Sequence, residues 1–159
     1  MTINERLDRT DLLILQALQQ NARLTNKELA AQVHLSPTPV FERWKRLERE
    51  GYIQRYVSVL DADKLNQGFI VFCLVKLRRL NTDVANDFTE RLANIPEVTE
   101  CYNISGHFDY LLKIHSYNMK QYQRFLLDTL GMIESVASIE SMFVMDEVKH
   151  DYGINLTLP

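Results

Sequence analysis

The chain has 159 residues, which is enough for one or two domains with buried cores. Its composition, 46% hydrophobic and 25% charged, is that of a globular protein and excludes a disordered chain. The net charge of −3 at pH 7 excludes a protein coated in positive charge.

Membrane insertion and secretion are not expected. The first six residues are polar and form no apolar signal-peptide core, and the longest apolar stretch, residues 68–77, contains Lys76 and is far shorter than a membrane span. Cys73 and Cys101 lie in strand-like apolar segments without a CxxC partner or a nearby histidine or cysteine at ligand spacing. This pattern predicts two buried thiols in a reducing cytoplasm rather than a disulfide or a zinc site.

Charge separates the chain into two parts. Residues 1–60 carry nine Lys and Arg against seven Asp and Glu, whereas residues 61–159 carry nine against fourteen. The difference indicates two domains with different partners.

The first part is predicted to be helical. Asp8 can cap a first helix, whose apolar residues gather on one side: Leu12, Ile14, Leu15 and Leu18. Residues 25–28, Thr-Asn-Lys-Glu, have the T-x-x-E form of a capping box and open a short second helix.

A third helix begins after Ser36, a good N-cap, with Pro37 in its first position. One apolar face carries Val40, Trp44 and Leu47, and Gly51 ends the helix. Residues 52–60 then favour a strand, and the polar residues 61–67 predict a linker.

The second part alternates strands and helices. Strands are predicted at 68–77, 98–105, 108–115 and 136–148, and helices at 83–94 and 119–130. The order β-α-β-β-α-β is the ferredoxin-like arrangement, so the whole chain is assigned to the α+β class. The side chains expected to face its core are Val84, Phe88, Leu92, Tyr110, Leu112, Ile114, Met119, Tyr122 and Leu126.

The second and third helices, joined by residues 33–35, meet the requirements of a helix-turn-helix. Such a third helix fits the major groove of DNA with its N-terminal residues at base edges. Phosphates or bases are the expected partners of one set of residues: Thr25, Ser36, Thr38, Pro39, Glu42, Arg43, Arg46 and Arg55. A basic run on an amphipathic helix is, however, more often a solvated face, so the pattern alone leaves both interpretations open.

Longer motifs resemble one family. They are Leu7-Asp-Arg-Thr-Asp, Asn21-Ala-Arg, Leu35-Ser-Pro-Thr-Pro-Val and Arg46-Leu-Glu-Arg-Glu-Gly-Tyr-Ile in the first part, and Ser105-Gly-His-Phe-Asp-Tyr-Leu-Leu and Val144-Met-Asp-Glu-Val in the second. In order and over nearly the whole chain, these motifs resemble the Lrp/AsnC family of transcription regulators. The resemblance implies a winged-type helix-turn-helix domain at residues 1–60, a linker at 61–67 and a ferredoxin-like domain at 68–159 that oligomerises and binds an effector. Trp44 departs from the family pattern, in which an aliphatic residue is more common.

The resemblance also implies an effector site beside a G-x-x-D turn. From the residues alone, Gly106 is a turn glycine and Asp109 a turn-stabilising carboxylate. The family implies that an amino-acid effector contacts this turn, through Asn103, Ser105, Gly106, His107 and Asp109, with Met132 as a further candidate. Asp109 would then bind the ammonium group and backbone N–H groups or hydroxyls the carboxylate.

The expected function is that of a DNA-binding transcription regulator that responds to a small molecule. The resemblance implies that this effector is an amino acid and that dimers assemble to an octamer. One alternative is an architectural protein that organises the nucleoid without an effector. Another is a regulatory subunit of a metabolic enzyme. The four histidines form no ligand pattern, and the sequence contains no catalytic constellation and no glycine-rich phosphate loop, so neither a metal cofactor nor an enzyme is expected.

Overall fold

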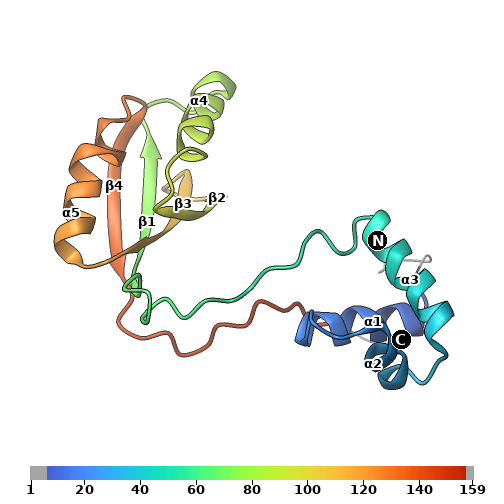
Figure 1. Cartoon of the computed structure of the whole chain (residues 1–159). Coiled ribbons are helices and arrows are strands. Elements are labelled where there is room, and N and C mark those ends of the chain that lie inside the picture. Colours follow the sequence, from blue (N-terminus) through green and yellow to red (C-terminus); the bar gives the residue numbers. More distant parts are fainter. Residues whose placement is uncertain (1–6, 157–159) are drawn as a thin grey trace. The chain divides into compact units, whose positions relative to one another are not determined.

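The structure is a computed structural model that describes residues 7–156, and the chain forms two compact units (Figure 1). The first unit combines the chain up to Val59 with the C-terminal segment from Lys149, and the second spans Leu60–Val148. The sequence placed residues 149–159 with the second domain, whereas the structure groups the described part of this segment, residues 149–156, with the first unit.

Three helices build the first unit: α1 (Arg9–Gln20), α2 (Asn26–Gln32) and α3 (Pro37–Arg49). Asp8 and Thr25 cap α1 and α2 in complete capping boxes, which confirms both predicted helix starts. Ser36 occupies the N-cap of α3 but its side chain makes no capping bond there. Gly51 follows the end of α3 with φ +78°, a backbone angle that favours glycine.

The core of the first unit lies between the three helices. Its buried side chains are Ile14, Ala17, Leu18, Leu24, Leu29, Ala30, Val33, Val40 and Leu47, with Leu15 and Trp44 partly buried against them. The apolar faces predicted for the first and third helices therefore both contribute to this core.

The predicted strand over residues 52–60 is wrong. This segment follows α3 in an irregular conformation and enters no sheet among the described residues. Its apolar side chains stay largely in solvent; Val57 and Val59 are each 62% exposed. A strand needs a neighbour to pair its backbone N–H and C=O groups, and apolar β-branched residues alone do not supply one.

The second unit is a four-stranded antiparallel sheet with the order β2-β3-β1-β4, which confirms the ferredoxin-like arrangement. The strands are β1 (Phe69–Leu77), β2 (Val98–Asn103), β3 (Tyr110–Ser116) and β4 (Val136–Phe143). The helices are α4 (Thr82–Leu92) and α5 (Met119–Asp128), and a 3₁₀ turn, η1 (Leu130–Met132), follows α5. The linker predicted at 61–67 lies in this unit and forms a turn in which Gln67 N–H donates to the carbonyl of Ala62 at 2.7 Å.

Both helices contribute to one core on the sheet. Phe88 and Leu92 of α4 and Tyr122 and Phe125 of α5 are buried with alternate residues of the central strands: Val71, Cys73, Val75, Leu77, Tyr110, Leu112 and Ile114. The predicted core positions are buried or partly buried except for Met119, the first residue of α5, which is 48% exposed. Cys101 is also exposed, contrary to prediction, because β2 is an edge strand, while Cys73 is buried as expected.

The alternate residues of the strands point to the other face, which carries no helix of this unit. We call this the open sheet face; its apolar members are Ile70, Phe72, Leu74, Leu111 and Met142. Phe72 stands in register with Lys113 on one side and Met142 on the other. Within residues 7–156, no helix is long and apolar enough to span a membrane.

Candidate functional site

The turn between α2 and α3 is tightly fixed. His34 takes a left-handed conformation with φ +56°, and Leu35 N–H donates to the carbonyl of Ala30 at 3.0 Å. Asn26 at the start of α2 donates from Nδ2 to the carbonyl of Pro37 at 3.0 Å. These bonds hold the first turn of α3 against α2, as a helix-turn-helix requires.

The N-terminal half of α3 presents an exposed face. Ser36, Thr38, Pro39 and Glu42, all candidates from the sequence, lie there in solvent. Sequence reasoning missed three further exposed residues on α3: Phe41, which is 43% exposed, Lys45 and Arg49. Their spacing from Thr38 of three, seven and eleven residues is the helical signal that places them on the same side. We call Thr38, Phe41, Glu42, Lys45 and Arg49 the exposed face of α3.

Arg43 and Arg46 instead turn toward α1. Arg43 Nη1 donates to Asp8 Oδ2 at 2.5 Å and to Asp11 Oδ1 at 2.8 Å, and Arg46 Nη2 donates to Asp11 Oδ2 at 2.5 Å. Asp11 is buried, with 1% of its surface exposed, while each guanidinium side chain is about one-third exposed. Hydrogen bonds to Asp11 and then to Asp8 raise the pKa of Arg43. The two arginines therefore join α3 to α1.

The remaining two DNA-contact candidates lie outside α3. The hydroxyl of Thr25 donates to Glu28 Oε2 at 2.7 Å and also accepts from the backbone N–H of Glu28. The Thr25 backbone N–H and then its hydroxyl lower the pKa of Glu28. Arg55 is exposed in the segment after α3. The hydroxyl of Thr25 is thus part of the capping box that starts α2.

Trp44 connects α3 to the segment that follows it. Its indole Nε1–H donates to the hydroxyl of Tyr56 at 2.6 Å, and that hydroxyl donates to Glu48 Oε1 at 2.8 Å. Glu48 also accepts from Lys45 Nζ at 2.7 Å. A smaller aliphatic residue at position 44 has no donor for Tyr56, so this connection depends on the tryptophan.

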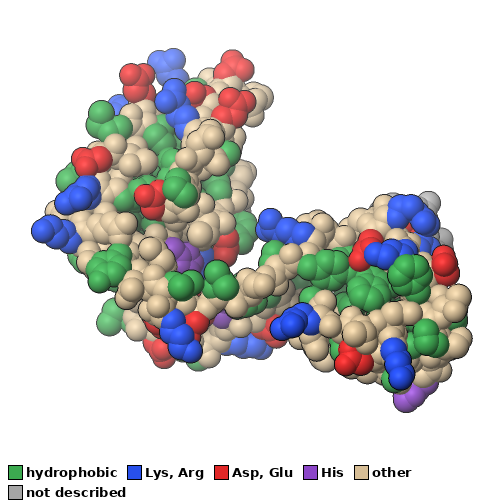
Figure 2. All heavy atoms as spheres, viewed as in Figure 1, with side chains coloured by type: hydrophobic (Ala, Val, Ile, Leu, Met, Phe, Trp, Pro, Cys, Tyr) green, Lys and Arg blue, Asp and Glu red, His purple; other side chains and the backbone are tan. Residues whose placement is uncertain are grey.

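Charge is mixed over the first unit. On the face seen in Figure 2, Lys and Arg side chains alternate with Asp and Glu on both units rather than forming one continuous basic patch. Strong electrostatic attraction to any DNA sequence is therefore not built into this face.

The G-x-x-D turn joins β2 to β3. Gly106 has φ +125°, so its backbone conformation favours glycine, and Ser105 and His107 beside it are exposed. Asn103 at the end of β2 donates from Nδ2 to the carbonyl of Asp109 at 3.0 Å and so closes the base of the turn. The structure thus brings Asn103, Ser105, Gly106 and His107 together in one exposed turn.

Asp109 lies beneath this turn rather than on its surface, with 4% of its surface exposed. Oδ1 accepts from Lys76 Nζ at 2.9 Å and Oδ2 accepts from the backbone N–H of Leu77 at 2.8 Å. Burial acts to raise the pKa of this carboxyl, but the Leu77 N–H and the Lys76 ammonium outweigh it and lower the pKa. Asp109 therefore fastens the turn to the end of β1.

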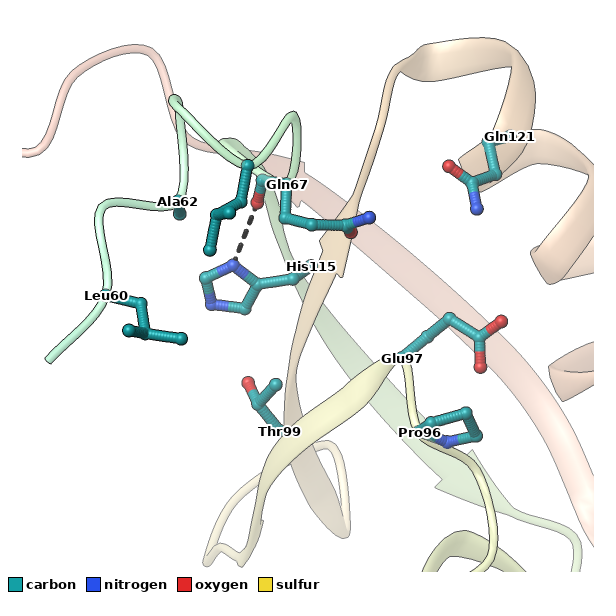
Figure 3. A pocket seen from close by; sticks show the side chains of 9 residues that line it. Leu60, Ala62, Gln67, Pro96, Glu97, Thr99, His115 and Gln121 are labelled. Carbon is teal, nitrogen blue, oxygen red and sulfur yellow. Dashed lines mark hydrogen bonds between the residues drawn. The ribbon is translucent and has the colours of Figure 1, made fainter. Parts of the chain in front are cut away.

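Met132 lies apart from the turn in sequence, in η1 before β4, and is 72% exposed. A cavity of about 560 Å³ lies at the other end of β3 (Figure 3). In it, His115 Nδ1 is 3.0 Å from the carbonyl oxygen of Gln67, and Glu97, Thr99 and Gln121 lie around it. None of the effector candidates lines this cavity. Across residues 7–156, no three His, Cys, Asp or Glu side chains are placed to hold a metal ion.

Known proteins match both units. Residues 7–54 match the winged helix-turn-helix DNA-binding family, and residues 70–154 match the Lrp/AsnC ligand binding domain. The leucine-responsive regulatory protein of Escherichia coli is 41% identical over 143 residues, which is 90% of this chain and 87% of that protein. The same identity and coverage are found with the leucine-responsive regulatory protein of Klebsiella pneumoniae.

Two solved structures agree over almost their full length. A transcriptional regulator of Neisseria meningitidis in complex with L-Met has a TM-score of 0.90 and 39% identity, covering 94% of this chain and 96% of that one. An AsnC family regulator of Agrobacterium tumefaciens has a TM-score of 0.89 and 32% identity, covering 94% and 97%. The chain belongs to the Lrp/AsnC family of DNA-binding transcription regulators, with a winged helix-turn-helix unit followed by a ligand-binding unit.

Proposed function

We propose that this regulator binds specific DNA sites through the exposed face of α3 and the turn before it, in response to an amino acid bound at the Gly106 turn. One observation supports this DNA interface above all: Asn26 of α2 holds the first turn of α3 in place, and the residues around that turn are exposed to solvent, namely Ser36, Thr38, Pro39 and Glu42. Hydroxyl and carboxylate groups at the start of such a helix contact base edges and phosphates. Phe41 adds an apolar contact for thymine methyl groups.

Arg43 and Arg46 act in this interface while they hold α3 to α1. A guanidinium has five N–H donors, and the bonds to Asp8 and Asp11 use one nitrogen of each arginine. Their one-third exposure leaves further donors for phosphate oxygens. Thr25 and Arg55 add phosphate contacts at the two ends of the motif.

The effector is an amino acid, and L-methionine is the first to test, because a similar regulator was solved as its complex. Backbone N–H groups of residues 105–107 and the Ser105 hydroxyl bind the carboxylate of the ligand. Asp109 supplies negative charge for the ammonium group; both of its oxygens already accept one bond, and a carboxylate can accept more. Asn103, His107 and Met132 border the same site.

The protein acts as a homo-oligomer. The open sheet face is apolar along Ile70, Phe72, Leu74, Leu111 and Met142, and a second copy of the chain covers it. The resulting dimer presents two α3 helices to DNA, and further association gives an octamer of four dimers. The protein requires no metal or cofactor, is not an enzyme, and acts in the cytoplasm on the nucleoid.

Footprinting on promoter DNA tests the DNA-binding proposal. Discrete protected sites repeating at about one helical turn, roughly 10 bp, support a sequence-specific regulator. Continuous protection along the fragment would instead favour an architectural role without sequence preference. Thr38→Ala is expected to weaken binding at the discrete sites, with unchanged thermal stability because Thr38 is exposed.

Calorimetry with amino acids tests the effector proposal. The wild-type protein is expected to bind L-methionine, and Ser105→Ala is expected to weaken that binding without changing the melting temperature. Equal affinity in the two proteins would remove the Gly106 turn from the site. A variant of the separate His115 cavity, Thr99→Ala, is the matched control.

A further inference from the structure

The C-terminal segment of the chain pairs with α1. Gln19 in the last turn of α1 donates from Nε2 to the carbonyl of Ile154 at 2.8 Å, and Ile154 N–H donates to Gln19 Oε1 at 3.1 Å. One side-chain amide therefore satisfies both backbone groups of a residue 135 positions later, much as a neighbouring strand would. We call residues 151–156 the C-terminal strap.

The strap is shaped for this contact. Gly153 N–H donates to Asp151 Oδ1 at 2.9 Å, which bends the chain just before Ile154. A Cβ atom on Gly153 would lie 2.6 Å from Gln19 Nε2, so a larger residue at this position would displace the Gln19 amide from its bonds to Ile154. The strap also closes one side of an apolar cavity of about 310 Å³ lined by Leu15, Leu18, Tyr52, Tyr56, Tyr152 and Ile154, among others.

This contact changes how the two units are connected. One covalent crossing from the DNA-binding unit to the ligand-binding unit lies between Val59 and Leu60, and a second lies between Val148 and Lys149. The second crossing starts from the sheet itself, because Val144 N–H continues the pairing of β4 with the Ile70 carbonyl at 3.1 Å. With the strap docked, α1 is therefore connected to the ligand-binding unit by two routes. One route runs through α3 and the crossing between Val59 and Leu60, and the other runs through the strap to the end of β4.

We propose that the strap is a built-in second attachment of the DNA-binding unit, held by Gln19, that limits its orientations and so raises its affinity for DNA. The partner of the α1 surface is the C-terminal segment of this same chain. A unit restrained at two points loses less orientational freedom when it binds DNA than a unit on one linker. The affinity effect rests on the proposed DNA-binding function, whereas the docking itself does not.

Gln19→Ala in the full-length protein tests both steps, with Gln20→Ala as the matched control because both glutamines are exposed in the last turn of α1. Hydrogen–deuterium exchange followed by mass spectrometry is expected to show faster exchange of residues 151–156 in Gln19→Ala than in the wild type. Fluorescence anisotropy with a footprinted DNA fragment is expected to show roughly tenfold weaker binding in the same variant. Gln20→Ala is expected to match the wild type in both measurements.

Gly153→Ala provides an independent disruption from the strap side and is expected to reproduce both effects. Equal exchange of the strap in the wild type and both variants would show that Gln19 does not hold it, and would overturn the proposal. Faster exchange with unchanged DNA affinity would overturn the proposed effect on binding. A wild type that fails to bind any DNA would overturn the proposed function and leave the exchange result as the test of docking.

Discussion

A single buried carboxylate, Asp11, organises the contact between α1 and α3, since it accepts from both Arg43 and Arg46. We expect Asp11→Asn to lower the free energy of unfolding of the first unit by about 2 kcal/mol. The loss is held below that of a fully buried pair because both guanidinium groups are about one-third exposed to solvent. Denaturant unfolding followed by the emission of Trp44 measures it.

Asp8→Asn is the matched control for this prediction. Asp8 bonds to Arg43 as well, but 52% of its side chain is exposed, so the loss of its charge is expected to cost less. Equal unfolding midpoints for Asp11→Asn and the wild type would contradict the role of Asp11.

The environment of Asp109 makes the stability of the second unit depend on pH. Because the folded state lowers the pKa of this carboxyl, its stabilising effect is complete above the ordinary value of 3.8 and is lost as the pH falls through the folded-state pKa. Asp109→Asn is expected to melt at a lower temperature than the wild type at neutral pH, with the two melting temperatures converging in acid. Circular dichroism melts over a pH series measure the difference. A constant gap at every pH would contradict this assignment.

At the level of elements, the Trp44–Tyr56 hydrogen bond fixes the segment after α3 onto that helix. Tyr56→Phe keeps the ring but removes the acceptor of the indole N–H. We expect it to lower the free energy of unfolding of the first unit by about 1 kcal/mol and to increase quenching of Trp44 by acrylamide. Tyr117→Phe, the same change at an exposed position of the second unit, serves as the control. Quenching that is unchanged by Tyr56→Phe would contradict the proposed contact.

Elements governed by local chemistry were predictable from the sequence. Asp8 and Thr25 mark helix starts because a capping bond joins residues three positions apart, and the alternation around Tyr110 identifies a strand with one buried face. The strand predicted at residues 52–60 failed because pairing depends on a partner that periodicity does not reveal. Cys101 failed for a related reason, since strand order decides which strand lies at an edge.

For the candidate site as well, the sequence predicts the features that depend on nearby residues but not the contacts between distant ones. The positions of Thr38 and Gly106 follow from helix spacing and turn chemistry. The contacts of Arg43, Asp109 and Gln19 join residues more than 30 positions apart, and no local pattern contains them. Arg43 and Asp109, which the sequence suggested as ligand contacts, therefore make structural connections within the fold, and their ligand contacts stay predictions.

For the whole molecule, the open sheet face predicts association. Phe72→Lys places a charge beside Lys113 in the centre of this face, and we expect it to lower the molar mass measured by light scattering to that of the monomer. DNA affinity is expected to fall with it, because the proposed dimer presents two α3 helices to DNA and the monomer presents one. Leu127→Lys on α5, at a position 63% exposed, is the control for the added charge. An unchanged mass for Phe72→Lys would place the interface elsewhere.

The chain also contains a natural pair of spectroscopic labels. Its only tryptophan, Trp44, belongs to the first unit, and one of its two cysteines, Cys101, is exposed in the second. The other, Cys73, is buried with its sulfur 3.0 Å from the Tyr122 hydroxyl, so a thiol-reactive dye reaches Cys101 selectively. Energy transfer from Trp44 to that dye then reports the distance between the two units in the unmutated protein. Comparing this distance with and without an added amino acid tests whether ligand binding changes the separation of the ligand-binding and DNA-binding units.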